Sequence, residues 1–145
     1  MAGKSDYLEN ALLKLIFNAT PIAYIADNAA TTPLTNLYLS LHTADPGDSG
    51  GQTTNETVYV GYARVALART SGGWTVTGNI VKPAATVEFA AAGTGTTPAV
   101  ITHVGIGVNA SAAGNLLYSG ALTPNISIVE GVIPRLTTAS SISED

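Results

Sequence analysis

The chain has no cysteine and only two histidines, His42 and His103, among its 145 residues. Without cysteine there is no disulfide framework and no thiolate chemistry. Two isolated histidines do not form the His/Cys cluster that a zinc ion requires. The sequence therefore predicts no metal site and no cofactor.

Charge is also scarce. The chain carries 6 Lys and Arg and 10 Asp and Glu, 11% of its residues, with a net charge of −4, whereas soluble domains average about 25% charged residues. The mean hydropathy is +0.27, so the apolar content suffices to drive folding. A surface with so few charges is poorly protected against association. We predict an assembly component that forms a homo-oligomer, either a trimer or a dimer.

The same scarcity limits the partners. Six scattered basic residues form no patch for nucleic acid. No apolar run approaches the roughly 18–20 residues that span a bilayer. We therefore expect neither a nucleic acid nor a membrane as a direct partner.

Catalytic chemistry finds little support in the residues. Gly105–Ile106–Gly107 lacks the third glycine and the following helix of a dinucleotide-binding motif. The acidic residues are sparse and stand mostly in expected loops or near the termini, so no glycosidase carboxylate pair can be argued. The sequence predicts that the protein is not an enzyme.

Residues 5–17 are predicted to form the one convincing helix, in which Ser5 is the N-cap and Asp6 and Glu9 stand in the first turn. A single apolar stripe follows the spacing of one helix face, made of Leu8, Ala11, Leu12, Leu15 and Ile16. A helix this short is marginal in water, so its stripe must dock on another surface. Docking on the chain's own sheet is favoured, and an arm that reaches a neighbouring subunit is the alternative.

The remainder indicates β-structure. Leu34–His42 predicts a strand with three leucines facing in (Leu37, Leu39 and Leu41) and three polar residues facing out (Tyr38, Ser40 and His42). A loop dense in turn residues follows at Asp45–Thr54. Further short strands are expected at Thr57–Arg69 (broken at Gly61), Gly73–Thr77, Ile80–Val81, Ala84–Phe89 and Arg135–Thr138. Short strands separated by turns predict a mainly β fold, an antiparallel β-sandwich or jelly-roll-like barrel with one N-terminal α-helix. We expect a single domain over residues 1–145, with residues 139–145 as a flexible tail.

The hairpin Val100–Leu122 is expected to form the centre of the fold. Its first strand alternates a Val/Ile face, predicted to build the core, with a face that carries His103, Gly105 and Gly107. Glycine in a strand lets another surface approach closely. His103 is favoured as a structural histidine, with a metal or pH-sensing role at an interface as the alternatives. The candidate interface residues are therefore Leu8, Leu12, Leu15, Ile16, Tyr38, His42, His103, Gly105 and Gly107.

Five segments in order resemble a family of small tailed-bacteriophage virion structural proteins. They are Lys4–Phe17, Leu37–Pro46, Gly61–Val65, Ile101–Ile106 and Gly114–Leu122. Members of this family are labelled tail-fibre-like or virion structural proteins, and related small β-proteins serve as capsid cement or decoration proteins. The resemblance implies no catalytic residues. It implies a protein made in the cytoplasm of the bacterial host and placed in the virion, on the capsid exterior or, alternatively, on the tail.

Two functions follow as expectations from that resemblance. The first is a capsid cement or decoration protein that binds and stabilises the shell of major capsid protein. The alternative is a tail-fibre or baseplate-associated protein involved in host attachment, with a recognition surface from Asp45–Thr54 and Asn109–Asn115. A polysaccharide-degrading virion protein is disfavoured because no carboxylate pair supports it.

Overall fold

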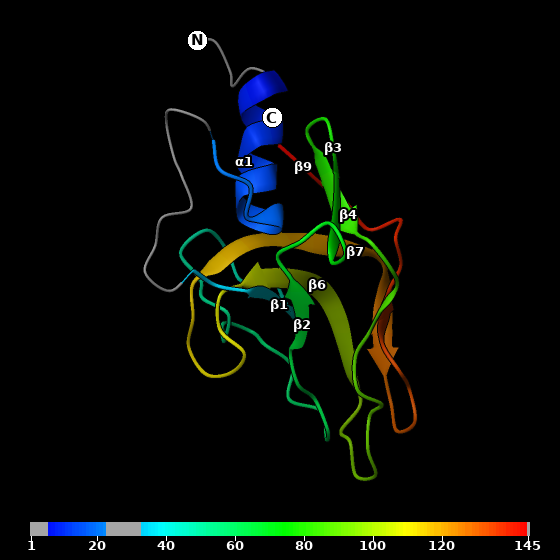
Figure 1. Ribbon diagram of the computed structural model, residues 1–145. Helices are drawn as coiled ribbons and strands as arrows, with labels where there is room; N and C mark the ends of the chain where they lie inside the picture. The colour runs from blue at the N-terminus through cyan, green and yellow to red at the C-terminus, as the bar shows by residue number, and fades with distance from the viewer. Residues whose placement is uncertain (1–5, 23–32, 145) are drawn as a thin grey trace. The chain divides into compact units, whose positions relative to one another are not determined.

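The computed structural model describes residues 6–22 and 33–144, with the backbone alone for residues 6–8. Figure 1 shows the elements of this part of the chain: α1 (Asp6–Asn18), β1 (Asn36–His42), β2 (Val65–Ala68), β3 (Trp74–Thr77), β4 (Ile80–Pro83), β5 (Val87–Glu88), β6 (Ala99–Gly107), β7 (Leu116–Ile128), β8 (Arg135–Leu136) and β9 (Ile142–Ser143). The expected mainly β class, with antiparallel pairing and one helix near the N-terminus, is confirmed. Within the described residues the sheets stay open, so the sandwich-like expectation fits and a closed barrel does not form.

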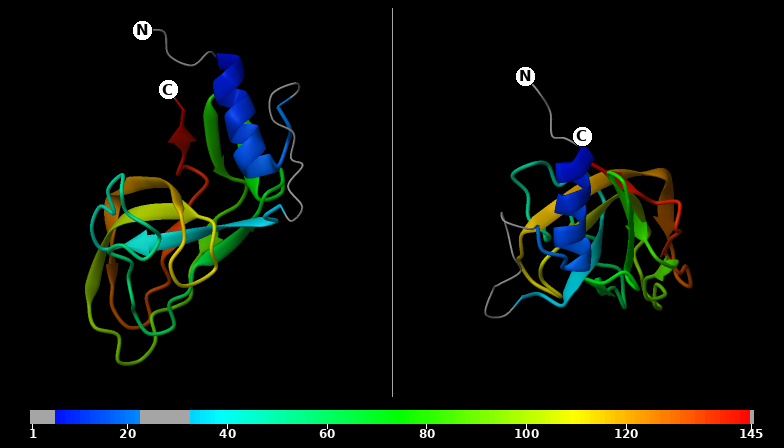
Figure 2. Two further views of the ribbon diagram at one scale, coloured as in Figure 1. Left: turned by 90° about the vertical axis from the view of Figure 1, so that its left-hand side faces the viewer. Right: turned by 45° about the horizontal axis from the view of Figure 1, so that its top comes forward.

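The chain divides into two compact units. The first unit comprises Met1–Asn36, Leu67–Val87 and Leu136–Asp145, and the second comprises Leu37–Ala66 and Glu88–Arg135. The first unit contains α1 and the three-stranded sheet β3-β4-β9. The second contains β1, β6 and β7, which run side by side in Figure 2. The single domain expected over residues 1–145 stays a prediction.

Strand β1 is buried on both faces. Leu37, Leu39 and Leu41 are at most 2% exposed, as predicted for the inward face. Ser40 and His42 are also 0% exposed, so the prediction that they face solvent is wrong. A polar residue at every second strand position usually indicates a wet face, but here hydrogen bonds satisfy the polar atoms inside the protein. The strand therefore separates an apolar layer from a polar layer.

The core face of β6 also differs from the prediction. Val100, on the face expected to build the core, is 49% exposed, while Ile101 on the other face is 0% exposed. Gly105 and Gly107 are buried as well, on the polar side that they share with Ser40. The register with β7 shifts after Ile101 and again after Ile106, which interrupts the simple two-residue alternation. The glycine face is thus buried by the chain itself.

Helix α1 packs on its own unit. Leu13 and Phe17 are 0% exposed and Glu9 is 8% exposed, so the buried stripe runs through these three positions. The ring centroids of Phe17 and Trp74 lie 4.7 Å apart in an edge-on arrangement. Docking on the chain's own strands, the favoured expectation, is therefore observed. The buried stripe is offset by one residue from the predicted one, so that Leu13 is buried in place of Leu12. One residue corresponds to a rotation of about 100° around the helix axis.

The C-terminus of α1 is capped by a residue from a distant part of the chain. The helix has no basic residue in its last turn. The guanidinium of Arg69 donates hydrogen bonds to the carbonyls of Ile16 (2.6 Å), Leu15 (2.8 Å) and Leu34 (2.8 Å). The last carbonyls of a helix lack intrahelical partners and carry partial negative charge. Arg69 supplies both the missing donors and the complementary charge.

The segment predicted as a flexible tail holds a strand. β9 pairs with β4, with Ile142 opposite Val81 and Ser143 opposite Ile80. The Glu144 amide and the Asn79 side chain add hydrogen bonds across the same edge. The tail prediction is therefore corrected for residues 142–144. Backbone pairing, which a polar sequence does not exclude, holds this segment.

Candidate functional site

Two loops of the second unit come together, and we call them the paired loops. Loop 43–55 follows β1, and loop 108–115 joins β6 to β7. An isolated β-bridge joins Gly51 to Asn115, and the Gln52 amide donates to the carbonyl of Gly114 at 3.0 Å. These loops contain the Asp45–Thr54 and Asn109–Asn115 segments that the sequence offered as a recognition surface. The structure thus brings the two predicted segments into direct contact.

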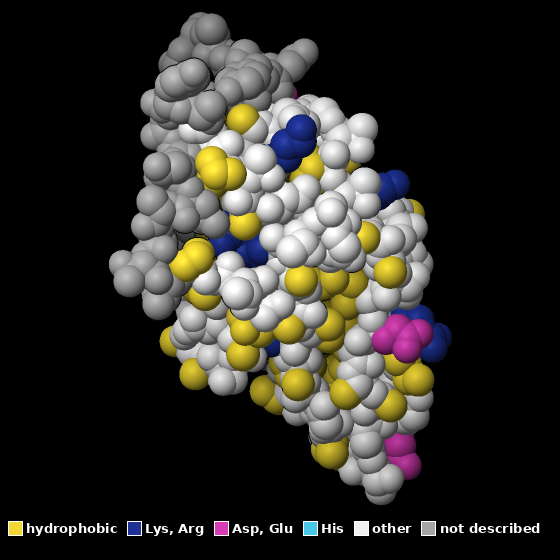
Figure 3. Space-filling model, viewed as in Figure 1, with side chains coloured by type: hydrophobic (Ala, Val, Ile, Leu, Met, Phe, Trp, Pro, Cys, Tyr) yellow, Lys and Arg dark blue, Asp and Glu magenta, His cyan; other side chains and the backbone are white. Residues whose placement is uncertain are grey.

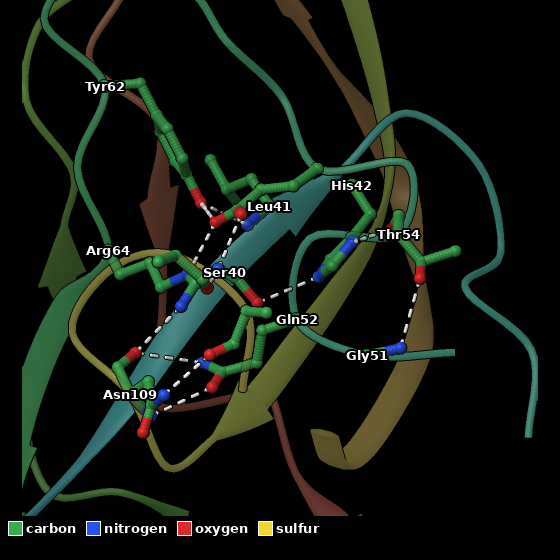
Figure 4. A network of polar contacts seen from close by, with 12 residues as sticks. Ser40, Leu41, His42, Gly51, Gln52, Thr54, Tyr62, Arg64 and Asn109 are labelled. Atoms are coloured by element: carbon green, nitrogen blue, oxygen red, sulfur yellow. Dashed lines mark hydrogen bonds and ion pairs between the residues drawn. The ribbon is translucent and has the colours of Figure 1, made fainter. Parts of the chain in front are cut away.

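Gln52 fastens the loops from inside. Its side chain is 0% exposed, and its Oε1 accepts hydrogen bonds from the backbone amides of Val108 (3.1 Å) and Asn109 (2.9 Å). Its Nε2 donates to the Asn109 carbonyl at 3.2 Å (Figure 4). A buried amide with this many partners resists rearrangement, because any change leaves polar atoms unpaired.

Two glycines make room for that side chain. A Cβ placed on Gly107 would lie 2.2 Å from Cδ of Gln52, and one on Gly114 would lie 2.3 Å from its Oε1. Both distances are far below van der Waals contact. Gly105 is similar, since its missing Cβ would meet His42 and Ser40 at 2.6 Å and 2.7 Å. The glycines predicted to admit a partner therefore admit the chain's own side chains.

A second fastening is an ion pair. Arg64 Nε and Nη2 donate to the two oxygens of Glu56, each at 2.7 Å, and the two side chains are only 3% and 13% exposed. Arg64 also donates to the carbonyls of Asn109 and Ala112, each at 2.9 Å. Charge-assisted, bidentate bonds of this kind fix geometry as well as adding energy. Arg64 therefore holds loop 108–115 against the segment that ends loop 43–55.

Tyr62 extends this ion pair toward β1. Its hydroxyl donates to Glu56 at 2.8 Å and accepts from the Leu41 amide at 3.1 Å. Burial raises the pKa of Tyr62 well above its usual range, and the hydrogen bond to Glu56 acts in the same direction. The hydrogen bond between Arg64 and Glu56 is the main cause that raises the pKa of Arg64. Tyr62 therefore stays neutral and donates its hydroxyl hydrogen bond to Glu56, while Arg64 stays charged.

His42 and Ser40 resemble a base and nucleophile but are closed to solvent. His42 Nδ1 lies 2.8 Å from the carbonyl of Thr54, so it must donate, and Nε2 then accepts from the Ser40 hydroxyl at 2.8 Å. Burial lowers the pKa of His42, which favours this neutral form. Both side chains are 0% exposed, so a substrate has no access to the hydroxyl. The pair ties β1 to the end of loop 43–55.

Another serine stands in a nucleophile-like sequence. Residues 47–51 read GDSGG, which matches the G-x-S-x-G pattern of α/β-hydrolases around Ser49. That pattern acts on a sharp turn between a strand and a helix, whereas here Ser49 is exposed on loop 43–55 and turns follow it. Both ring nitrogens of His42 are already engaged by other partners. The context of a catalytic serine is therefore not met.

The predicted interface residues fall in two places. In α1, Leu12, Leu15 and Ile16 are half-buried, and the Leu8 side chain lies outside the described residues. On the β1–β6 pair, Tyr38 lies opposite Gly107 and His42 opposite His103, and Gly105 lies between these two pairs, so five of the predicted residues share one face. Contact with a partner stays a prediction for the half-buried ones, which are Leu12, Leu15, Ile16, Tyr38 and His103. His42, Gly105 and Gly107 are buried by their own chain, which corrects the expectation of a partner there.

Sequence reasoning missed the residues that hold the loops. Gln52 stands among turn residues without any motif around it, and Glu56 and Arg64 are eight positions apart on segments without regular structure. In so weakly charged a chain, one signal was present: an Arg and a Glu only eight positions apart, with the Arg between two apolar residues. Within residues 6–22 and 33–144, no group of three His, Cys, Asp or Glu side chains could hold a metal ion. In the same residues, no helix is long and apolar enough to cross a membrane.

The fold and the paired loops define a class. The protein is a weakly charged, mainly β protein whose paired loops are held together by buried hydrogen bonds and an ion pair. The chain belongs to the family described as podophage GP4 fiber I protein gp80, whose model matches residues 3–142. It is thus a tailed-phage virion structural protein, as the five-segment resemblance indicated. None of the curated proteins compared with the chain matches it.

Proposed function

We propose that the protein is a component of the tail-fibre region of a phage particle and that the paired loops contact the host surface. The family description, which names a fibre protein, supports this reading better than it supports the capsid cement role. The observation that carries the proposal is the bracing of the paired loops by Gln52 and Arg64. A surface whose loops are already ordered loses little entropy on binding.

The exposed part of the paired loops suggests the chemistry of the contact. Residues 109–115 carry no charge and present small and amide side chains, with Asn109, Ser111 and Asn115 exposed. Loop 43–55 adds exposed hydroxyl, amide and carboxylate groups. Such a surface favours a partner recognised through hydrogen bonds, rather than one steered by strong charge.

Adsorption to host cells tests the proposal. Purified protein should bind the host and compete with the phage, and the double variant Ser111→Lys/Ala113→Lys should lose most of that binding. A matched control is Ala84→Lys/Thr86→Lys, which adds the same charge at two exposed positions of the other unit. Equal binding by both variants, or no binding by the unmodified protein, contradicts the role of the paired loops.

The location in the particle separates the two expected roles. Immunogold labelling should mark the tail-fibre region, and quantitative mass spectrometry should find a small copy number in each virion. A capsid cement protein would instead decorate the shell in tens to hundreds of copies and bind the major capsid protein, a partner that stays a prediction. Shell labelling at high copy number overturns the fibre assignment.

A further inference from the structure

Strand β7, which lies in the second unit, ends the four-stranded sheet formed by the described residues, whose order is β2-β1-β6-β7. It is 13 residues long, and one edge pairs with β6. At its start, Asn115 is already bridged to Gly51. Farther along, Pro124 has no amide hydrogen to donate. Between these two points, residues 119–123 form a stretch of sheet edge that pairs with no further strand among the described residues.

Backbone chemistry defines what can cover such an edge. An edge strand presents a row of N–H and C=O groups that another strand can pair with. Natural proteins usually protect long edges with charged side chains, especially lysine. No residue of β7 is charged, and Ser119, Gly120, Ala121 and Thr123 are all exposed. The edge is chemically suited to pairing and lacks the usual protection.

The same features favour a second copy of the chain as the occupant. An antiparallel pair of identical strands related by a two-fold axis is self-complementary and closes without further growth. Around that axis each residue faces its own copy or a near neighbour, so a charged strand would repel itself. β7 has no charge to repel. At its centre, a Cβ on Gly120 would meet nothing within 4 Å, and its neighbours Ser119 and Ala121 are small.

We infer that residues 119–123 of β7 pair antiparallel with the same residues of a second copy, forming a two-fold symmetric dimer with a continuous eight-stranded sheet. This interaction surface does not depend on the host-contact role of the paired loops. The proposed dimer explains why β7 carries no charged residue, since charges there would repel their copies. The face seen in Figure 3 also shows few charged side chains, and these are scattered.

Mass measurement in solution tests the dimer. By light scattering coupled to size exclusion, the full chain should have twice its 14.7 kDa monomer mass. The variant Ser119→Lys/Ala121→Lys should run as a monomer that stays folded, with an unchanged circular dichroism spectrum, since both positions are exposed. The matched control Ser111→Lys/Ala113→Lys changes the same residue types at the same spacing in loop 108–115 and should remain a dimer. A monomeric wild type, a trimer, or a β7 variant that stays dimeric overturns the inference.

Single cysteines locate the axis, because the chain has no cysteine of its own. We would place one cysteine at a time at Ser119, Gly120 and Ala121 and oxidise each protein. Directly opposite residues in an antiparallel pair have Cα atoms about 4.5–5.5 Å apart, within the reach of a disulfide. At least one position should give a covalent dimer, whereas Ser111→Cys should not. A dimer without any crosslink in this stretch places the contact elsewhere and contradicts the inference.

Because the host-binding and dimer assays use different readouts, the two proposals fail separately. Ser111→Lys/Ala113→Lys should lose host binding and keep the dimer. Ser119→Lys/Ala121→Lys should lose the dimer, and each monomer should retain its paired loops. If adsorption is absent but the dimer forms through β7, only the host-contact proposal is overturned.

Discussion

Two arginines five residues apart bind different kinds of partner in the two units. Arg64 is in the second unit and is paired with the Glu56 carboxylate as well as two backbone carbonyls. Arg69 is in the first unit and binds backbone carbonyls of Leu15, Ile16 and Leu34. One arginine neutralises a buried charge, and the other complements the dipole of a helix. The environment, not the residue type, therefore sets what each arginine stabilises.

The largest expected effect is the loss of Arg64. Arg64→Ala leaves the Glu56 carboxylate buried without its cation, and breaking a buried ion pair in this way costs about 3–5 kcal/mol. Urea unfolding should show this loss, and hydrogen exchange should show loop 108–115 opening first. The double variant Arg64→Met/Glu56→Leu should recover much of the stability, since it leaves no unpaired charge. Loss as large in the double variant as in Arg64→Ala would show that the ion pair is not the cause.

The corresponding change in the first unit should cost less. Arg69→Ala removes charge-assisted hydrogen bonds but leaves only neutral carbonyls behind, so we expect a loss of about 2 kcal/mol. The fluorescence of Trp74, the one tryptophan of the chain, reports on this unit because Trp74 packs against Phe17 of α1. Arg69→Lys should retain part of the stability through its charge. An effect larger than that of Arg64→Ala would reverse the proposed difference between the arginines.

A glycine variant loosens the paired loops without changing any charge. Gly107→Ala places a Cβ 2.2 Å from the Gln52 side chain, which must move and lose its hydrogen bonds, at a cost of about 1–3 kcal/mol. Thermal unfolding and hydrogen exchange of loop 43–55 should both detect this change. Gly72→Ala is the matched control, because its added Cβ would lie 3.6 Å from the Thr70 hydroxyl oxygen, an ordinary van der Waals contact. Equal losses in the two variants would show that the space around Gln52 does not matter.

The smallest expected effect is a pH dependence confined to the second unit. Burial lowers the pKa of His42 in the folded state below the value of about 6.5 in the unfolded chain. The unfolded chain therefore binds more protons. The contribution of His42 to the free energy of unfolding is fully present above about pH 6.5, and it falls by up to about 1.4 kcal/mol per pH unit below that value. Urea unfolding of the wild type and of His42→Gln between pH 5 and 7.5 should show that the variant loses this contribution. Identical slopes would exclude His42 as its source.

Much of the fold could be predicted where local patterns carried the information. The helix, the leucine face of β1 and the hairpin at Val100–Leu122 follow from periodicity and turn residues. The candidate site was predicted only as two loop segments. Its bracing residues, Gln52, Glu56 and Arg64, were missed because long-range hydrogen bonds leave no periodic trace in a sequence. Glycine patterns indicated a close approach correctly, but not which group approaches.

The sequence by itself determined the composition, the positions of most elements and the membership of a phage virion family. Its low charge and alternating strands are properties of each residue and its nearest neighbours. Only the tertiary structure decided that Ser40 and His42 lie in a buried polar layer, that Arg69 caps α1 and that Gln52 fills the space over Gly107. The physical reason is that burial and hydrogen bonding depend on which distant segments meet. A polar residue in a strand is exposed or buried according to the partner that the fold brings to it.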